Sequence, residues 1–168
     1  QKMKILVSYI TDKFSLLQNL WRRAKETNEG DAFHGIDKFE ELDLGGLVQV
    51  IDWNSKIVKQ ELHLPTPAGF DSSKKDIYLA IEGTKIVLLD RLLRTKRVIT
   101  HHLFIDLHGL NLTSRGILVI SSGIDSIIEV SSSGDELFRW MATEHGYPSD
   151  PKGRIRTIHQ DSDHRYKK

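Results

Sequence analysis

The chain has 168 residues, the length of one ordinary domain. Its 24 lysines and arginines nearly balance its 23 aspartates and glutamates, which gives a formal net charge of +1. So small a net charge provides no long-range field for nucleic acid or an anionic membrane surface, so neither is expected as a partner. With 39% apolar and 28% charged residues, the chain is expected to be globular.

The sequence contains no cysteine, which removes disulfides, thiolate metal sites, iron–sulfur clusters and cysteine nucleophiles. This composition fits a reducing compartment, and we predict a cytoplasmic location. The apolar run Ile5–Val7 ends at Ser8, far short of the ~20 residues that a membrane-spanning helix needs. No small-residue cleavage site follows this run, so it is not expected to be a signal peptide.

The first predicted unit covers about residues 4–63 and carries an insertion. Lys4–Ile10 and Gly46–Asp52 are rich in β-branched residues and predict two strands. In the segment 11–45 between them, apolar residues from Phe14 to Ala24 recur at helical spacing after a capping Asp12, which predicts one inserted helix. The insertion is interpreted as a lid, a partner-binding element or a decoration.

Two units of short strands follow, at about residues 66–104 and 106–142. Turn residues separate the strands, as in antiparallel hairpins. The expected strands are Ile77–Ile81, Ile86–Leu89 and Arg97–His101 in the first of these units, and Asp106–Thr113, Ile117–Ser122, Ser126–Ser131 and Glu136–Ala142 in the second. The remaining segment, 143–168, is expected to be a loop or closing segment.

The units repeat with a period of about 40 residues. Ala68–Asp71 aligns with His108–Asn111, Gly83 with Gly123, Ile86–Asp90 with Ile127–Ser131, and Leu47–Asp52 with the stretch that ends at Asp90. About four strands in each 40-residue unit are typical of a β-propeller blade. We therefore predict an all-β fold of about three four-stranded antiparallel sheets in one partial-propeller domain; the alternative is a plain β-sandwich.

The stretch His102–Gly146 resembles a blade of a six-bladed propeller. Asp125–Val130, Gly134 and Phe138–Trp140 are similar to the blades of arylsulfotransferase-like propellers. His108-Gly109-Leu110 resembles the start of an inner strand in the NHL-like group that includes the peptide-amidating lyases. The first resemblance implies a histidine that carries sulfate, and the second implies a histidine that binds a divalent metal ion in the central channel.

His108 is the main candidate for chemistry because its repeat equivalent is Ala68 and an inner strand begins at the mouth of the channel. An imidazole there could be a nucleophile, a base or a metal ligand, or only a structural histidine. Asp106, two residues earlier, could share its face. His164 and Arg165 are expected to start the next inner strand; the alternative is a frayed polar terminus. We predict His108, His164 and Arg165 as catalytic, His108 and His164 as metal ligands, and Asp106 and His145 as substrate-binding.

The expected function is that of an enzyme with a small-molecule ligand at the channel mouth, a sulfotransferase-like transferase or a metal-dependent lyase or hydrolase. The alternative is a non-catalytic scaffold whose inserted helix docks a partner. Because a closed propeller needs at least four blades, three blades predict an assembly. Either a homodimer closes a six-bladed ring, or a second chain carries the remaining blades.

Overall fold

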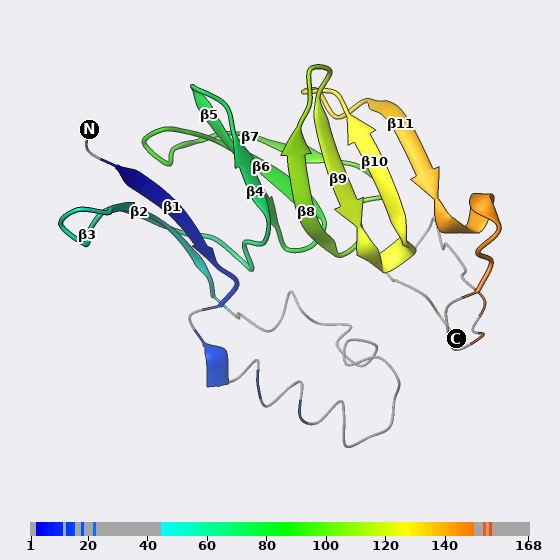
Figure 1. The fold of residues 1–168 in the computed structure, drawn as a ribbon, viewed down its shortest axis with the longest axis horizontal. Helices are drawn as coiled ribbons and strands as arrows, with labels where there is room; N and C mark the ends of the chain where they lie inside the picture. The colour runs from blue at the N-terminus through cyan, green and yellow to red at the C-terminus, as the bar shows by residue number, and fades with distance from the viewer. Residues whose placement is uncertain are drawn as a thin grey trace. The chain divides into compact units, whose positions relative to one another are not determined.

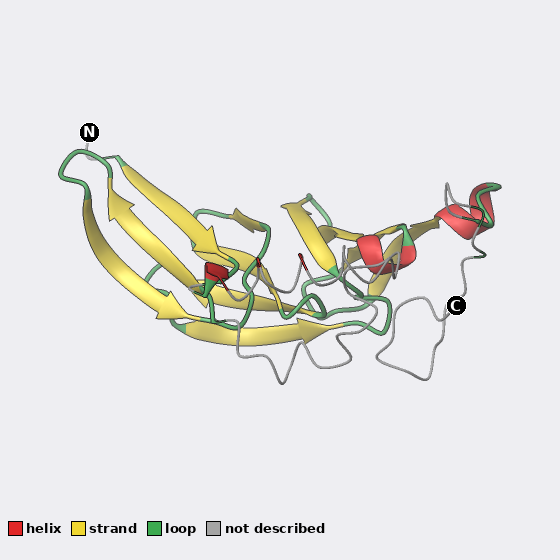
Figure 2. Cartoon of the chain, turned by 90° about the horizontal axis from the view of Figure 1, so that it is seen from below, coloured by secondary structure: helices red, strands yellow, loops and turns green. Residues whose placement is uncertain are grey.

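The structure, a computed structural model, describes residues 3–11, 13–15, 18, 22, 45–149, 153 and 155. Strands make up most of this part of the chain (Figure 2). The strands are β1 (Lys4–Tyr9), β2 (Leu47–Asp52), β3 (Ile57–His63), β4 (Phe70–Ser72), β5 (Asp76–Ile81), β6 (Lys85–Asp90), β7 (Thr95–Thr100), β8 (Leu107–Leu112), β9 (Ile117–Ser121), β10 (Ser126–Val130) and β11 (Glu136–Met141). None of the helical residues described forms a segment long and apolar enough to cross a membrane.

The strands form three antiparallel sheets, and the prediction of an all-β fold is confirmed. Contacts divide the chain into two units, Gln1–Pro67 and Ala68–Lys168. The first unit holds the sheet β1-β2-β3, and the second holds the sheets β4-β5-β6-β7 and β8-β9-β10-β11 (Figure 1). Each sheet connects neighbouring strands in order, as the blades of a propeller do. Their grouping into one propeller domain stays a prediction.

The three sheets share one register, which supports the repeat seen in the sequence. Each has a β-bulge at the same place, where the second-last strand pairs with the last. The bulges lie at Val50/Ile51 in β2, Leu88/Leu89 in β6 and Glu129/Val130 in β10. A bulge shifts the pairing by one residue and raises the local twist. Because the bulge occurs at the same place in each sheet, it identifies which residues of the three sheets are equivalent.

The main core of the second unit lies between its two sheets. In β8–β11 the side chains of Ile117, Val119, Ile128 and Val130 are buried on one face, which we call the front face. They belong to one cluster with buried residues of the preceding sheet, Ala80, Ile86 and Ile99, which share the opposite, back face of β4–β7. Period-two alternation along each strand creates these two faces. Leu103, Phe104, Ile105 and Ile124 complete the cluster.

Backbone hydrogen bonds join the inner strand β8 to the preceding sheet. The Gly69 N–H donates to the carbonyl of His108 (3.1 Å), and the Leu107 N–H donates to the carbonyl of Gly83 (2.8 Å). A Cβ on Gly69 would lie 2.5 Å from the His108 carbonyl oxygen, so only glycine allows this approach. These bonds connect β8 to Gly69, just before β4, and to Gly83, in the turn between β5 and β6.

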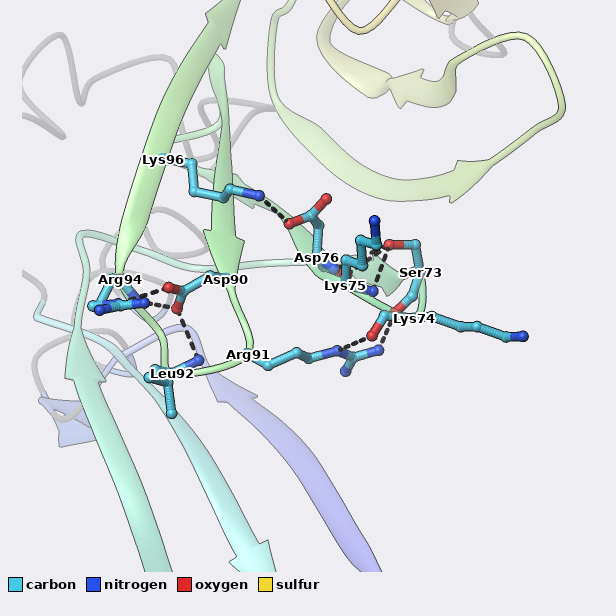
Figure 3. A network of polar contacts seen from close by, with 9 residues as sticks. All are labelled: Ser73, Lys74, Lys75, Asp76, Asp90, Arg91, Leu92, Arg94 and Lys96. Atoms are coloured by element: carbon cyan, nitrogen blue, oxygen red, sulfur yellow. Dashed lines mark hydrogen bonds and ion pairs between the residues drawn. The ribbon is translucent and has the colours of Figure 1, made fainter.

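A polar network lies at the edge of β4–β7 where the turn between β6 and β7 is found (Figure 3). The Asp90 carboxylate accepts hydrogen bonds from the backbone N–H groups of Leu92 (2.8 Å) and Arg94 (3.0 Å). The Arg94 backbone bond, with further bonds from its side chain and from Leu92, lowers the pKa of Asp90. An ion pair of 2.6 Å joins Lys96 Nζ to Asp76 Oδ1. These contacts stabilise the turns, and they give the carboxylates of Asp90 and Asp76 hydrogen-bond or ion-pair partners.

The predicted insertion falls mostly outside the described residues. Phe14, Ser15, Gln18 and Arg22 have helical backbone geometry, in agreement with a helix at this place. The other residues that define the expected helix are not described, so its role as a lid or docking element stays a prediction.

Candidate functional site

Asp106 directly precedes β8, the inner strand of the last sheet, and has a fixed conformation. Its φ of 55° is left-handed, which is uncommon for a residue with a side chain. Ser122, in the turn after β9, contacts it through its side chain and its backbone: the Ser122 hydroxyl donates to the carbonyl of Asp106 (2.7 Å) and lies 2.9 Å from its Oδ2. The Ser122 N–H donates to the same carbonyl (3.2 Å). The Asp106 carboxylate is thus oriented before any ligand arrives.

His108 lies beside this carboxylate. Its Nε2 is 3.4 Å from Asp106 Oδ2, and the two side chains are 66% and 42% exposed. The strand has a bulge between Leu107 and Gly109, so His108 and Asp106 meet through this irregularity rather than through plain alternation. A carboxylate beside one ring nitrogen orients an imidazole, and the exposed ring of His108 leaves its Nδ1 accessible to a ligand.

A second pair, Glu61 and His63, shows which features set the Asp106–His108 pair apart. His63 Nε2 lies 3.2 Å from Glu61 Oε1, and the side chains are 69% and 42% exposed. Both residues lie within β3, the last strand of the first sheet. Proximity and exposure are therefore common to the two pairs. The left-handed Asp106, its hydroxyl clamp and its inner-strand position distinguish the first pair.

Charged groups of the preceding sheet lie at the same edge, and the sequence alone did not single them out. Glu82 and Lys85 form an ion pair across the turn between β5 and β6. The carbonyl of Gly83, in that turn, accepts the hydrogen bond from Leu107. Ser122, which orients Asp106, occupies the position equivalent to Glu82. In the sequence, these residues were marked only by lying in turns that contain Gly83 and Gly123, the two glycines that the repeat of about 40 residues aligns.

His145 does not lie with the Asp106–His108 pair. It ends the short 3₁₀ helix Ala142–His145 after the outer strand, and its ring stacks on Trp140 at a centroid distance of 5.1 Å. The register places the start of β8 and the end of β11 at the same edge, but with two strands between them. At about 4.8 Å per strand, the end of β11 lies roughly 14 Å from the start of β8 along this edge, and His145 follows the end of β11. Its substrate-binding role stays a prediction.

His164 and Arg165 lie outside the described residues, so their catalytic roles and the metal ligation by His164 stay predictions. Within the part of the chain that the structure describes, no group of three or more His, Asp or Glu side chains is arranged to hold a metal ion. Asp106 and His108 could supply two ligands, and a divalent ion would take the rest from elsewhere.

No family model and no curated protein matches this sequence. Among solved structures, the chain is similar to a structure described as dihydro-heme d1 dehydrogenase NirN in complex with DHE. The likeness has a TM-score of 0.39 at 14% identity and covers 65% of this chain. It covers 24% of the other chain, so this chain spans about a quarter of that protein.

Proposed function

We propose that this chain contributes propeller blades to a small-molecule enzyme, with His108 as nucleophile or base and Asp106 as its orienting partner. The observation that carries the proposal is the Asp106–His108 pair, held by Ser122 at the start of an inner strand. A histidine positioned by a carboxylate is the arrangement that acid–base and nucleophilic catalysis requires. The resemblance to arylsulfotransferase-like blades makes aryl sulfates the first substrate class to test.

The test is the release of 4-nitrophenol from 4-nitrophenyl sulfate in the presence of a phenol acceptor. We expect turnover by the wild-type chain and a loss of about 100-fold or more in His108→Ala. Asp106→Asn keeps the shape of the side chain but removes its charge, and we expect a loss of turnover smaller than that in His108→Ala. His63→Ala is the matched control, because it removes an equally exposed histidine beside a carboxylate. Equal turnover in His108→Ala and wild type would contradict the proposal.

A metal-dependent lyase or hydrolase is the second candidate, supported by the same two side chains, which are both common metal ligands. Elemental analysis of the purified protein separates the two candidates. A stoichiometric transition metal that is lost in both His108→Ala and Asp106→Ala would favour the second. A metal content unchanged in these variants would remove the pair from any metal site.

A further inference from the structure

Basic side chains gather at the edge of β4–β7 where the β4–β5 and β6–β7 turns lie, and we call this surface the basic edge (Figure 3). All of its members are exposed: Lys74, Lys75, Arg91, Arg94 and Lys96. Arg94 forms an ion pair with Asp90, and Lys96 forms one with Asp76. Among the residues that the structure describes, no carboxylate lies within ion-pair distance of Lys74, Lys75 or Arg91. The basic edge therefore carries positive charge that its own acidic residues do not balance.

The β4–β5 turn closes through its serine and not through its lysines. The Ser73 hydroxyl oxygen accepts a hydrogen bond from the backbone N–H of Lys75 (3.2 Å). In the equivalent β8–β9 turn, the Thr113 hydroxyl oxygen accepts the same bond from the backbone N–H of Arg115 (3.1 Å). The Arg115 side chain has an acidic partner in Glu129, whereas the side chain of Lys75 has none in the described part of the chain. The ammonium group of Lys75 is thus not explained by the turn.

The β6–β7 turn leads to the same conclusion for Arg91. The Asp90 carboxylate accepts a hydrogen bond from the backbone N–H of Leu92 (2.8 Å), and in the equivalent β10–β11 turn the Ser131 hydroxyl accepts the corresponding bond. That second turn has Ser132 where the first has Arg91, and it contains no basic residue. Because the two repeats close the same turn with and without a cation, the fold does not require Arg91 at this place.

The guanidinium of Arg91 is held in position by neutral acceptors. Its Nε donates to the carbonyl of Lys74 (3.3 Å), and its Nη2 donates to the carbonyl of Ser73 (Figure 3). Carbonyl groups do not compensate its charge, and a guanidinium has five N–H donors, so further donors remain for an anionic ligand. Leu92, the next residue, is 58% exposed. The basic edge thus combines an oriented guanidinium, two lysines and one exposed apolar side chain.

From these observations we propose that the basic edge docks an acidic peptide segment of a partner protein, in which one apolar side chain covers Leu92. Carboxylates match the charge of Lys74, Lys75 and Arg91, and complementary charge gives specificity and fast association. Nucleic acid would match the charge but would leave Leu92 uncovered. A single exposed leucine buries too little apolar area to hold the chain on a membrane surface.

This docking surface is separate from the proposed catalytic pair. The basic edge lies at the Asp76 end of β5, and the turn that contains Gly83, which binds the Leu107 N–H, follows the other end. At about 3.4 Å per residue, β5 separates the two edges by roughly 20 Å. The docking proposal therefore does not depend on the proposed enzymatic activity.

The test is fluorescence anisotropy of the full chain with a labelled acidic peptide, EEDLEDEE, and with EEDSEDEE, in which serine replaces the leucine. We expect the wild-type chain to bind the leucine peptide, with an affinity that falls as the salt concentration rises. Combined Lys74→Glu and Lys75→Glu should weaken this binding about 10-fold or more. Leu92→Ser should weaken binding of the leucine peptide and leave binding of the serine peptide unchanged.

The matched control is the combination of Lys56→Glu and Lys59→Glu, which changes the net charge equally at exposed lysines of the first sheet. This control should bind the leucine peptide as the wild-type chain does, and circular dichroism should show every variant folded. Equal losses in the two double variants would show attraction by net charge alone and would overturn the proposal. Absence of peptide binding would overturn it, and so would tighter binding of an oligothymidylate of the same length or of phosphatidylserine vesicles.

Discussion

The Gly69 N–H donates a hydrogen bond of 3.1 Å to the carbonyl of His108, and it joins two residues that occupy neighbouring positions in successive repeats. Gly69 directly precedes β4, and His108 lies in β8, the inner strand of the next sheet; Figure 1 shows the two strands. It shows that the repeat in the sequence corresponds to a physical stacking of sheets. It also fixes the backbone of the histidine that carries the proposed chemistry.

Gly69→Ala should therefore destabilise the second unit. The new Cβ would lie 2.5 Å from the His108 carbonyl oxygen, which forces the inner strands apart. We expect a loss of about 1–3 kcal/mol in the free energy of unfolding, measured by urea denaturation. Gly109→Ala is the control at the equivalent position, where the Cβ would make only an ordinary contact of 3.5 Å with Ile120. Equal losses in the two variants would show that the close approach is unimportant.

Ile128→Ala should show where the core of this unit lies. Ile128 is 0% exposed and belongs to the cluster between the two sheets. Its truncation leaves a cavity as well as losing buried apolar area, and we expect a loss of about 2–5 kcal/mol. Val98→Ala, at a β7 residue that is 47% exposed, should cost far less. Similar unfolding midpoints for both variants would contradict the assigned packing.

The stability of the fold should depend on pH through His101. Burial, with the neighbouring His102, lowers the pKa of His101 below its ordinary value of 6.5. Its Nδ1 also accepts a hydrogen bond from the Leu103 N–H (3.3 Å). As the pH falls through about 6.5, His101 therefore gains a proton in the unfolded chain but stays neutral in the folded chain. The contribution of His101 to the free energy of unfolding is present above that pH and is lost on acidification.

His101→Asn tests this dependence, because asparagine keeps an acceptor for Leu103 and does not titrate. Urea unfolding at about pH 7.5 and about pH 5.5 should show a smaller loss on acidification in the variant than in wild type. His63→Asn, at an exposed histidine, should leave the dependence unchanged. An identical pH dependence in His101→Asn and wild type would exclude His101 as its source.

The buried carboxylate of Glu129 should make Arg115 important for stability. The Glu129 side chain is 4% exposed, forms an ion pair with Arg115, and accepts a hydrogen bond of 2.6 Å from the Thr113 hydroxyl. Arg115→Ala leaves this acceptor short of a partner, and we expect a loss of about 1–3 kcal/mol. Leucine stands at the equivalent position in the preceding repeat, Leu88. The Arg115→Ala loss should shrink in a Glu129→Leu background, and an unchanged loss in that double-mutant cycle would contradict the coupling.

The sequence contained enough information for the strands and their repeat, and it singled out Asp106 and His108, but it did not contain the geometry that brings these two side chains together. Periodic apolar runs and glycine turns predicted strands such as Ile86–Leu89 and Ser126–Ser131 close to where β6 and β10 lie, because local alternation determines them. The contact between Asp106 and His108 depends on a left-handed residue and a bulge, which leave no period in the sequence. The role of Ser122 depends on a contact across 16 residues, so it could be found only in the structure.

The turnover of 4-nitrophenyl sulfate by His108→Ala tests most directly the central proposal, that the histidine beside Asp106 carries the chemistry of this chain. With a phenol as acceptor, the account predicts a loss of about 100-fold or more in His108→Ala and unchanged turnover in His63→Ala. Equal turnover in His108→Ala and wild type would contradict the account.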